Sequence, residues 1–163
     1  MNYYLIDASA FVYAVENINR TKMDFFMEKA EGTAFLYVPQ FCVAEVLNTY
    51  ARLFFRESRI AGKLYTQWRN EFLKAIRSRR TLYCYDLHRY HNLNADRIYR
   101  KEHRIPYQGN ENSLSAFDIL IIAMGMELKK IHSSNEVTIL TRDIRLRTIS
   151  NSSGEFVPAI WFE

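Results

Sequence analysis

Residues 3–9 read Tyr-Tyr-Leu-Ile-Asp-Ala-Ser, an apolar run that ends in a carboxylate, a small residue and a hydroxyl. Such a run is typical of a central strand in a parallel sheet, where both faces of the strand are buried. A short apolar helix over residues 10–15 is expected to follow at once. In open α/β sheets, ligands bind outside the carboxyl ends of the strands. The stretch therefore predicts that Asp7 stands at a ligand-binding edge.

The same alternation continues outward from this stretch. Apolar runs predict strands over residues 3–9, 34–38, 82–87, 137–140 and 156–162. Helical spacing predicts helices over 10–15, 22–30, 40–59, 63–79, 90–103 and 114–130, with a short helix ending at 149. Pro39 is expected to end its strand, because proline cannot donate to a ladder. Leu93 is expected to face the core, and Phe117 is one of the apolar residues of the helix predicted over 114–130. Strands that alternate with helices predict an α/β fold with a mostly parallel sheet.

Composition narrows the class of protein. The chain has 163 residues, of which 48% are hydrophobic, so a single globular domain over 1–163 is expected. The five Gly and three Pro argue against a loop-rich β sandwich. Two Cys are too few for a disulfide scaffold, which favours a reduced, cytoplasmic protein. No apolar run is long enough for a membrane span, and the amino terminus lacks the basic region of a signal peptide.

Charge is distributed unevenly along the chain. Residues 52–104 hold 14 Lys and Arg against 5 Asp and Glu, a net charge of +9. The other residues hold 8 Lys and Arg against 13 Asp and Glu, a net charge of −5. The basic middle indicates either a polyanion or an acidic protein as partner, or simply solvated helix faces.

Four acids lie in or beside apolar stretches: Asp7, Glu45, Asp118 and Asp143. Charged residues are almost never fully buried without a partner, so each asks for a reason. Asp7 and Asp143 follow buried strands, and the other two lie near the amino ends of helices. Acids from separate elements that converge at a sheet edge can hold Mg²⁺ or Mn²⁺, which prefer oxygen ligands.

Each acid also has a purely structural interpretation. Asp7 and Asp143 could cap the helices that follow them. Glu45 could be an exposed residue that pairs with an arginine. Asp118 fits a capping box with Ser115 as the N-cap. These structural roles are individually reasonable, but all four together, in this order and on these elements, are a less economical explanation.

The ordered set of motifs resembles the PIN domain, a family of metal-dependent ribonucleases that includes many toxins of toxin–antitoxin pairs. The matching segments are Leu-Ile-Asp-Ala-Ser at 5–9, Val-Pro at 38–39, Val-Ala-Glu-Val-Leu at 43–47, Ser-Ala-Phe-Asp-Ile-Leu-Ile-Ile-Ala at 115–123 and Leu-Thr-Arg-Asp at 140–143. Together they extend from residue 1 to about 150. The resemblance implies a three-layer α/β/α fold.

By this resemblance, Asp7, Glu45, Asp118 and Asp143 are the catalytic and metal-binding acids, and Ser9 and Thr141 support them through their hydroxyls. It also implies Mg²⁺ or Mn²⁺ as cofactor, hydrolysis of RNA phosphodiester bonds, an antitoxin protein as partner and a homodimer. Two other hypotheses stay open. One is a catalytically inactive RNA-binding or scaffold protein with the same fold, and the other is a stand-alone RNA-processing nuclease.

Two further patterns concern the middle of the chain. Its arginines could form a track for the RNA backbone, and six are taken as RNA-binding: Arg52, Arg56, Arg77, Arg79, Arg80 and Arg100. Cys84, His88 and His91 have a spacing that could indicate zinc. A structural zinc site needs four ligands, however, and no fourth is close in the sequence.

Overall fold

The computed structural model describes residues 1–16, 30–78, 82–132 and 137–162. These residues contain five strands, β1 (Asn2–Ile6), β2 (Ala34–Pro39), β3 (Tyr83–Tyr85), β4 (Val137–Thr141) and β5 (Ala159–Trp161). The strands form one sheet in the order β3-β2-β1-β4-β5, and every neighbouring pair is parallel. The predicted parallel sheet is confirmed, with β1 at its centre.

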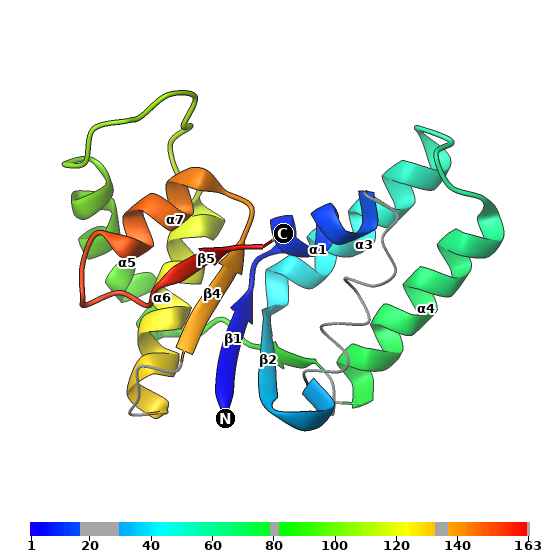
Figure 1. Ribbon diagram of the computed structural model, residues 1–163, viewed down its shortest axis with the longest axis horizontal. Helices are drawn as coiled ribbons and strands as arrows, with labels where there is room; N and C mark the ends of the chain where they lie inside the picture. The colour runs from blue at the N-terminus through cyan, green and yellow to red at the C-terminus, as the bar shows by residue number, and fades with distance from the viewer. Residues whose placement is uncertain (17–29, 79–81, 133–136, 163) are drawn as a thin grey trace.

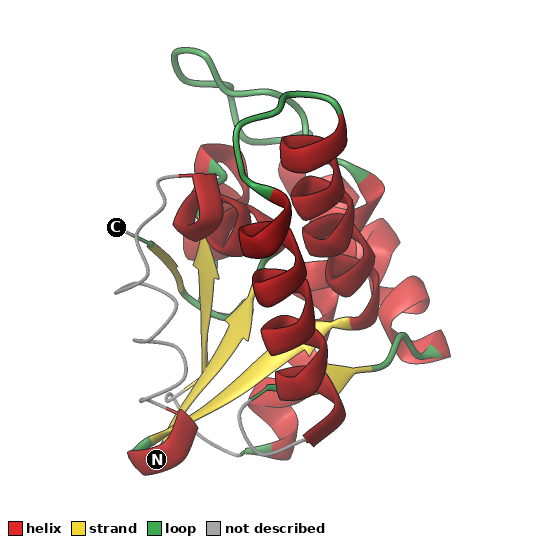
Figure 2. Ribbon diagram, turned by 90° about the vertical axis from the view of Figure 1, so that its right-hand side faces the viewer, coloured by secondary structure: helices red, strands yellow, loops and turns green. Residues whose placement is uncertain are grey.

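Helices cover both faces of the sheet (Figure 1). One group consists of α1 (Ala8–Glu16), α3 (Gln40–Phe55) and α4 (Gly62–Ser78), and the other of α5 (Arg89–Glu102), α6 (Ala116–Ile131) and α7 (Ile144–Asn151). Figure 2 shows helices in front of the strands and behind them. The expected three-layer α/β/α fold is therefore confirmed. None of the described helices combines the length and the hydrophobicity that crossing a bilayer requires.

The central strands are buried on both faces, as the apolar runs predict. Leu5 and Ile6 of β1 and Ile139 of β4 have no exposed surface. On β4, helix α6 packs unusually closely at Gly125. A Cβ atom added to this glycine would lie 3.3 Å from side-chain carbons of Ile139 and Val157. A larger residue at this position would therefore push α6 away from the sheet.

The connections of the sheet create a crevice between β1 and β4. The chain leaves β1 through α1 toward one face, whereas it leaves β4 through α7 toward the other. Such a reversal opens a crevice at the carboxyl ends of the two strands. The backbone N–H of Asp7 donates to the carbonyl oxygen of Leu140 at 3.0 Å, which places Asp7 directly beside the end of β4.

Several predicted boundaries are wrong. The first strand ends at Ile6, because α1 already begins at Ala8. β2 ends at Pro39, as predicted, but the strand includes this residue, which pairs with Tyr85 where no further ladder bond is required. The helix predicted over 40–59 ends at Phe55, and Ser58 adopts a positive φ of 52° in the turn that follows. The strand predicted over 156–162 is confined to 159–161, and most of the helix predicted over 22–30 lies outside the described residues.

Leu93, which the helical spacing predicts to face the core, is exposed, and so is the apolar side chain of Phe117. Leu93 on α5 is 67% exposed, and Phe117 at the start of α6 is 50% exposed. The helices that carry these two residues are as predicted. Helical spacing identifies a face, and only the packing of distant elements decides which part of the face is covered.

Candidate active site

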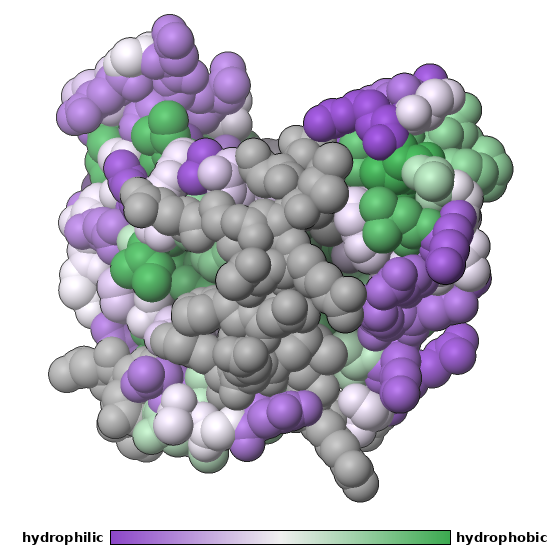
Figure 3. All heavy atoms as spheres, turned by 45° about the vertical axis from the view of Figure 1, so that its right-hand side comes forward, coloured by the Kyte–Doolittle hydropathy of each residue, from purple (hydrophilic) through white to green (hydrophobic). Residues whose placement is uncertain are grey.

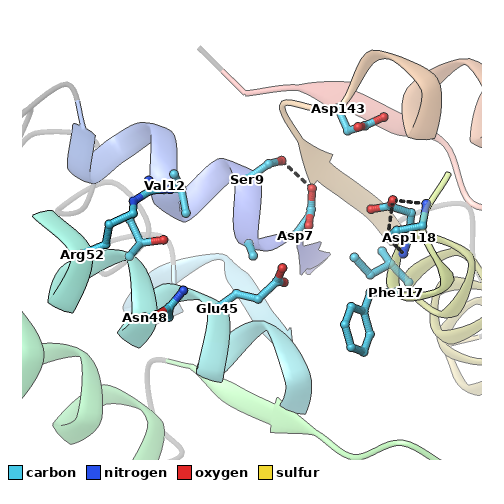
Figure 4. A pocket seen from close by; sticks show the side chains of 13 residues that line it. Asp7, Ser9, Val12, Glu45, Asn48, Arg52, Phe117, Asp118 and Asp143 are labelled. Carbon is cyan, nitrogen blue, oxygen red and sulfur yellow. Dashed lines mark hydrogen bonds between the residues drawn. The ribbon is translucent and has the colours of Figure 1, made fainter. Parts of the chain in front are cut away.

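A pocket of about 350 Å³ lies at the carboxyl ends of the central strands. The four predicted acids all line it: Asp7 after β1, Glu45 from α3, Asp118 from α6 and Asp143 after β4 (Figure 4). Figure 3 shows the surface hollowed between two prominences, formed by the loop after α5 and by the connection between α3 and α4. Residues far apart in the sequence thus reach one place because the parallel strands end at one edge.

Asp7 is the most deeply buried of the four acids, with 5% of its surface exposed. The hydroxyl of Ser9 donates to its Oδ2 atom, and Thr141 Oγ1 donates to the same oxygen at 2.7 Å. Burial raises the pKa of Asp7 to about 6, although these hydrogen bonds act in the opposite direction. The carboxylate is therefore fixed in one orientation, in surroundings that disfavour its negative charge.

The two hydroxyls also tie Asp7 to the end of β4. Ser9 Oγ accepts from the backbone N–H of Arg142 at 2.8 Å, and Thr141 Oγ1 accepts from that of Asp143 at 2.9 Å. Each hydroxyl thus accepts from the β4 turn and donates to Asp7. Ser9 and Thr141 therefore hold the Asp7 carboxylate next to the end of β4.

Asp143 has a structural role as well as a place in the pocket. Its Oδ1 atom accepts from the backbone N–H of Leu146 at 2.6 Å, so Asp143 caps α7. Asp118 likewise completes a capping box. Its Oδ2 atom accepts from the backbone N–H and the hydroxyl of Ser115, at 2.8 and 2.6 Å. Capping and pocket lining coexist here, because the helix ends themselves border the pocket.

The acids interact electrostatically. Burial is the main cause of the raised pKa values of Asp7, Glu45 and Asp143, and the negative charge of Asp118 raises all three further. Four carboxylates that share a site repel one another, and a cation among them removes the repulsion. This electrostatic coupling distinguishes the pocket from a set of unrelated surface acids.

The donor set fits a hard, hydrated cation. Among the described residues, no three His, Cys, Asp or Glu side chains lie close enough together to surround a metal ion by themselves. Mg²⁺ usually takes only one or two carboxylates and keeps several waters. The four acids around an open pocket therefore suit Mg²⁺ or Mn²⁺ better than an ion that needs a closed set of protein ligands.

The zinc hypothesis for Cys84, His88 and His91 does not fit the geometry. His91 is fully buried, and its Nδ1 atom accepts from the backbone N–H of His88 at 2.9 Å. Its Nε2 atom lies 2.7 Å from Glu127 Oε2, which also accepts from the hydroxyl of Tyr85. Both ring nitrogens are thus engaged in hydrogen bonds, and neither is available to a metal.

The predicted RNA-binding arginines occupy different places. Arg52 lines the acidic pocket, and Arg56 is the C-cap of α3. Arg77 borders a second pocket along α4, whereas Arg100 borders a third beside α5. Helices α4 and α5 lie on opposite sides of the sheet (Figure 1), so these residues belong to separate basic surfaces. Arg79 and Arg80 lie outside the described residues.

The sequence patterns did not identify all the residues of the pocket. Asn48 and Phe117 also line it. Asn48 follows Glu45 by three residues and precedes Arg52 by four, so one face of α3 points at the pocket. That spacing was available in the sequence. The exposure of Phe117 was not, because it depends on where α3 lies relative to α6.

Fold and site together define a doubly wound α/β protein with an acidic crevice at its topological switch point. The PIN domain model matches residues 4–151, and the chain belongs to the PIN domain family, whose members are generally nucleases. No curated protein sequence matches the chain. Among solved structures, it is similar to a chain of the crystal structure of VapBC2 from Rickettsia felis bound to a DNA fragment from their promoter. The TM-score is 0.61 at 14% identity, and the match covers 99% of each chain.

Proposed function

We propose that this protein is a metal-dependent endoribonuclease that hydrolyses RNA phosphodiester bonds and acts as the toxin of a toxin–antitoxin pair in the cytoplasm. The observation that supports nuclease activity is the acidic pocket. Four acids from four elements line it, and the charge of Asp118 raises the pKa of each of the other three. A protein that only binds RNA gains nothing from negative charge gathered beside the phosphates.

The residues of the pocket have different roles in this proposal. Asp7, Glu45, Asp118 and Asp143 would hold Mg²⁺ or Mn²⁺ in the pocket, directly or through the waters that such an ion keeps. A bound ion of this kind supplies an activated water and stabilises the charge on a phosphate under attack. Ser9 and Thr141 keep the Asp7 carboxylate in one orientation. Arg52, on the rim of the same pocket, would bind a neighbouring phosphate of the RNA.

The direct test is cleavage by the purified protein. Structured and single-stranded RNAs are incubated with Mn²⁺, with Mg²⁺ or with EDTA, and Asp118→Asn is assayed in parallel. We expect cleavage that requires a divalent metal and is lost in the variant. If well-folded protein free of any bound inhibitor cuts no RNA with either metal, the nuclease assignment is wrong. A binding protein would then be the better hypothesis.

Metal binding separates the nuclease from an inactive binder without any cleavage assay. We expect Mn²⁺ to raise the thermal stability of the wild-type protein, because binding to the native state alone stabilises it. Asp7→Asn should abolish that effect. If Mn²⁺ neither binds nor stabilises the wild type, a catalytically inactive RNA-binding or scaffold protein is favoured.

The toxin role rests on the fold shared with a chain of the VapBC2 structure. A toxin should arrest the growth of a host that expresses it, and co-expression of a neighbouring gene product, the antitoxin, should relieve the arrest. A stand-alone RNA-processing nuclease would cleave RNA without this toxicity and without such a neighbour. Homodimer formation belongs to the same proposal, and measurement of the mass in solution tests it.

A further inference from the structure

An aromatic pair stands at the edge of the acidic pocket. Phe41 of α3 and Phe117 of α6 stack on each other, with ring centroids 4.9 Å apart and an interplanar angle of 22°. Phe41 is partly buried, whereas Phe117 is 50% exposed and lines the pocket. Figure 4 shows the ring of Phe117 below Asp118 and across from Glu45. The pair thus joins the two helices that carry these acids.

An exposed phenylalanine is not unusual in itself, but the position at which Phe117 is exposed is unusual. Single exposed apolar side chains are common on protein surfaces. Phe117, however, precedes the pocket acid Asp118 directly, and the ring that supports it comes from another helix. Phe41 stacks on the Phe117 ring, which is half exposed and lines a pocket whose other residues are mostly polar. The arrangement leaves a flat aromatic surface available beside the acids.

Polar groups of α3 continue from this pair along one face of the helix. Glu45, Asn48 and Arg52 follow Phe41 by 4, 7 and 11 residues and all line the pocket. A rise of 1.5 Å per residue places them about 6, 10 and 16 Å along the helix axis from Phe41. Along this face, the aromatic pair could contact a base and the carboxylate a metal-bound phosphate. The amide and the guanidinium could contact a further phosphate of the same strand.

We propose that Phe117, backed by Phe41, is a stacking platform for an unpaired nucleobase next to the phosphodiester bond that is cut. Aromatic side chains bind single strands by stacking on bases, and a base inside a duplex does not present its face. The platform adds a contact with a base to the contacts that the pocket offers to the phosphates of the strand. This inference rests on the proposed ribonuclease activity and specifies the substrate of the same pocket.

The kinetic test compares Phe117→Ala with Leu93→Ala, which removes another exposed apolar side chain, from α5 and away from the pocket. For a single-stranded RNA we expect Phe117→Ala to raise KM by about 5- to 150-fold, the range for loss of one base-stacking contact. kcat should change much less, because stacking binds substrate and transition state alike. Phe117→Tyr should restore the wild-type KM, and Leu93→Ala should match the wild type.

Substrate variants show whether a base is the group recognised. After the wild type has mapped the cut, oligonucleotides that lack a single base near it are compared with the intact strand. Removing the stacked base should raise KM for the wild type and leave KM of Phe117→Ala unchanged. A duplex of the same sequence should be cut more slowly than the single strand by the wild type.

A second measurement does not depend on cleavage. In Phe117→Trp, single-stranded RNA should quench the indole fluorescence, since the new ring stacks on a base. The same RNA should change the fluorescence of Leu93→Trp no more than it changes that of the wild-type protein. Quenching should occur with EDTA present, when no RNA is cut.

The outcomes separate the platform from the nuclease. If the wild type cuts RNA but Phe117→Ala has the wild-type KM and Phe117→Trp shows no quenching, the platform is wrong and the nuclease stands. A side chain of a partner protein would then be the better candidate for the group that packs on the Phe117 ring. If the wild type cuts no RNA yet Phe117→Trp is quenched, the nuclease fails and base binding remains.

Discussion

Asp118 combines a structural and an electrostatic role in one side chain. It accepts two hydrogen bonds from Ser115 and raises the pKa values of the other pocket acids. Asparagine keeps an accepting oxygen for the cap but carries no charge. We expect Asp118→Asn to lower RNA cleavage by at least about 100-fold. The free energy of unfolding should change by less than about 1 kcal/mol in a urea titration.

The control for this variant is Asp96→Asn. Asp96 is an exposed acid on α5 that pairs with Arg100 at 2.7 Å, outside the pocket. The Asp96→Asn variant should cleave RNA at the wild-type rate. Full activity in Asp118→Asn, with the fold intact, would remove Asp118 from the metal-binding set.

Asp7 should make the metal-free protein less stable as the pH rises. Its pKa is about 6 in the folded protein, above the value of 3.8 for the unfolded chain. Between these values the folded state holds a proton that the unfolded chain has released, so the stability falls as pH rises through this window. The loss amounts to about 3 kcal/mol at pH 7.

Asp7→Asn isolates this effect. In EDTA, the variant should have about the wild-type stability near pH 4 and exceed it by up to about 3 kcal/mol at pH 7. Urea unfolding at a series of pH values measures the difference, and the variant should also have lost RNA cleavage. A difference that does not change with pH would mean that folding does not shift the pKa of Asp7.

At the scale of secondary-structure elements, a buried arginine joins α7 to the loop after α5. Arg145 is 1% exposed, and its Nη2 atom donates to the carbonyl oxygens of Glu102 and Ile105 at 2.9 and 2.8 Å. Its guanidinium also pairs with the carboxylates of Glu102 and Glu111, both at 3.1 Å. Because this loop leads into the Ser115 cap of α6, Arg145 couples the ends of two helices that supply pocket acids.

Arg145→Met should therefore destabilise the protein strongly. Removing one partner of a buried ion pair leaves the other charge uncompensated, at a cost of about 3–5 kcal/mol. The matched control is Arg147→Met on the same helix. Arg147 makes a cation–π contact with Trp161 at 5.2 Å, and its loss should cost about 1 kcal/mol or less. Thermal or urea unfolding measures both. Equal effects of the two variants would show that the buried network contributes little.

For the whole molecule, the distribution of positive charge decides how RNA can lie on it. The described basic residues of α4 and α5 flank opposite sides of the sheet, and Arg52 lies between them at the pocket. If an arginine contacts a phosphate, its replacement by a neutral residue makes the slope of log K against log salt concentration less steep by about 0.7 for a single strand. We expect this decrease for Arg52→Gln, Arg77→Gln and Arg100→Gln.

Binding is measured by fluorescence anisotropy in the Asp118→Asn background, so that the RNA stays intact. Arg89→Gln, at the other end of α5 from Arg100, is the control and should keep the slope. A variant whose slope does not change marks a side of the molecule that RNA does not touch. Loss at Arg77 alone or at Arg100 alone would place the strand on one side of the sheet.

The sequence by itself determined the order of strands and helices, the parallel sheet and the four acids that line the pocket. These features depend on local patterns. Apolar runs identify strands that are buried on both faces, and a carboxylate directly after such a strand must stand at the edge of the sheet. The family follows from the same short motifs in their order.

Only the tertiary structure decided how these parts act on one another. The exposure of Phe117, the coupling of Asp118 to the other acids and the separation of Arg77 from Arg100 each depend on elements far apart in the chain. The exposure of Leu93 has the same origin. The environment of a side chain is set by whichever distant segments pack around it, and spacing along the chain carries no record of those distances.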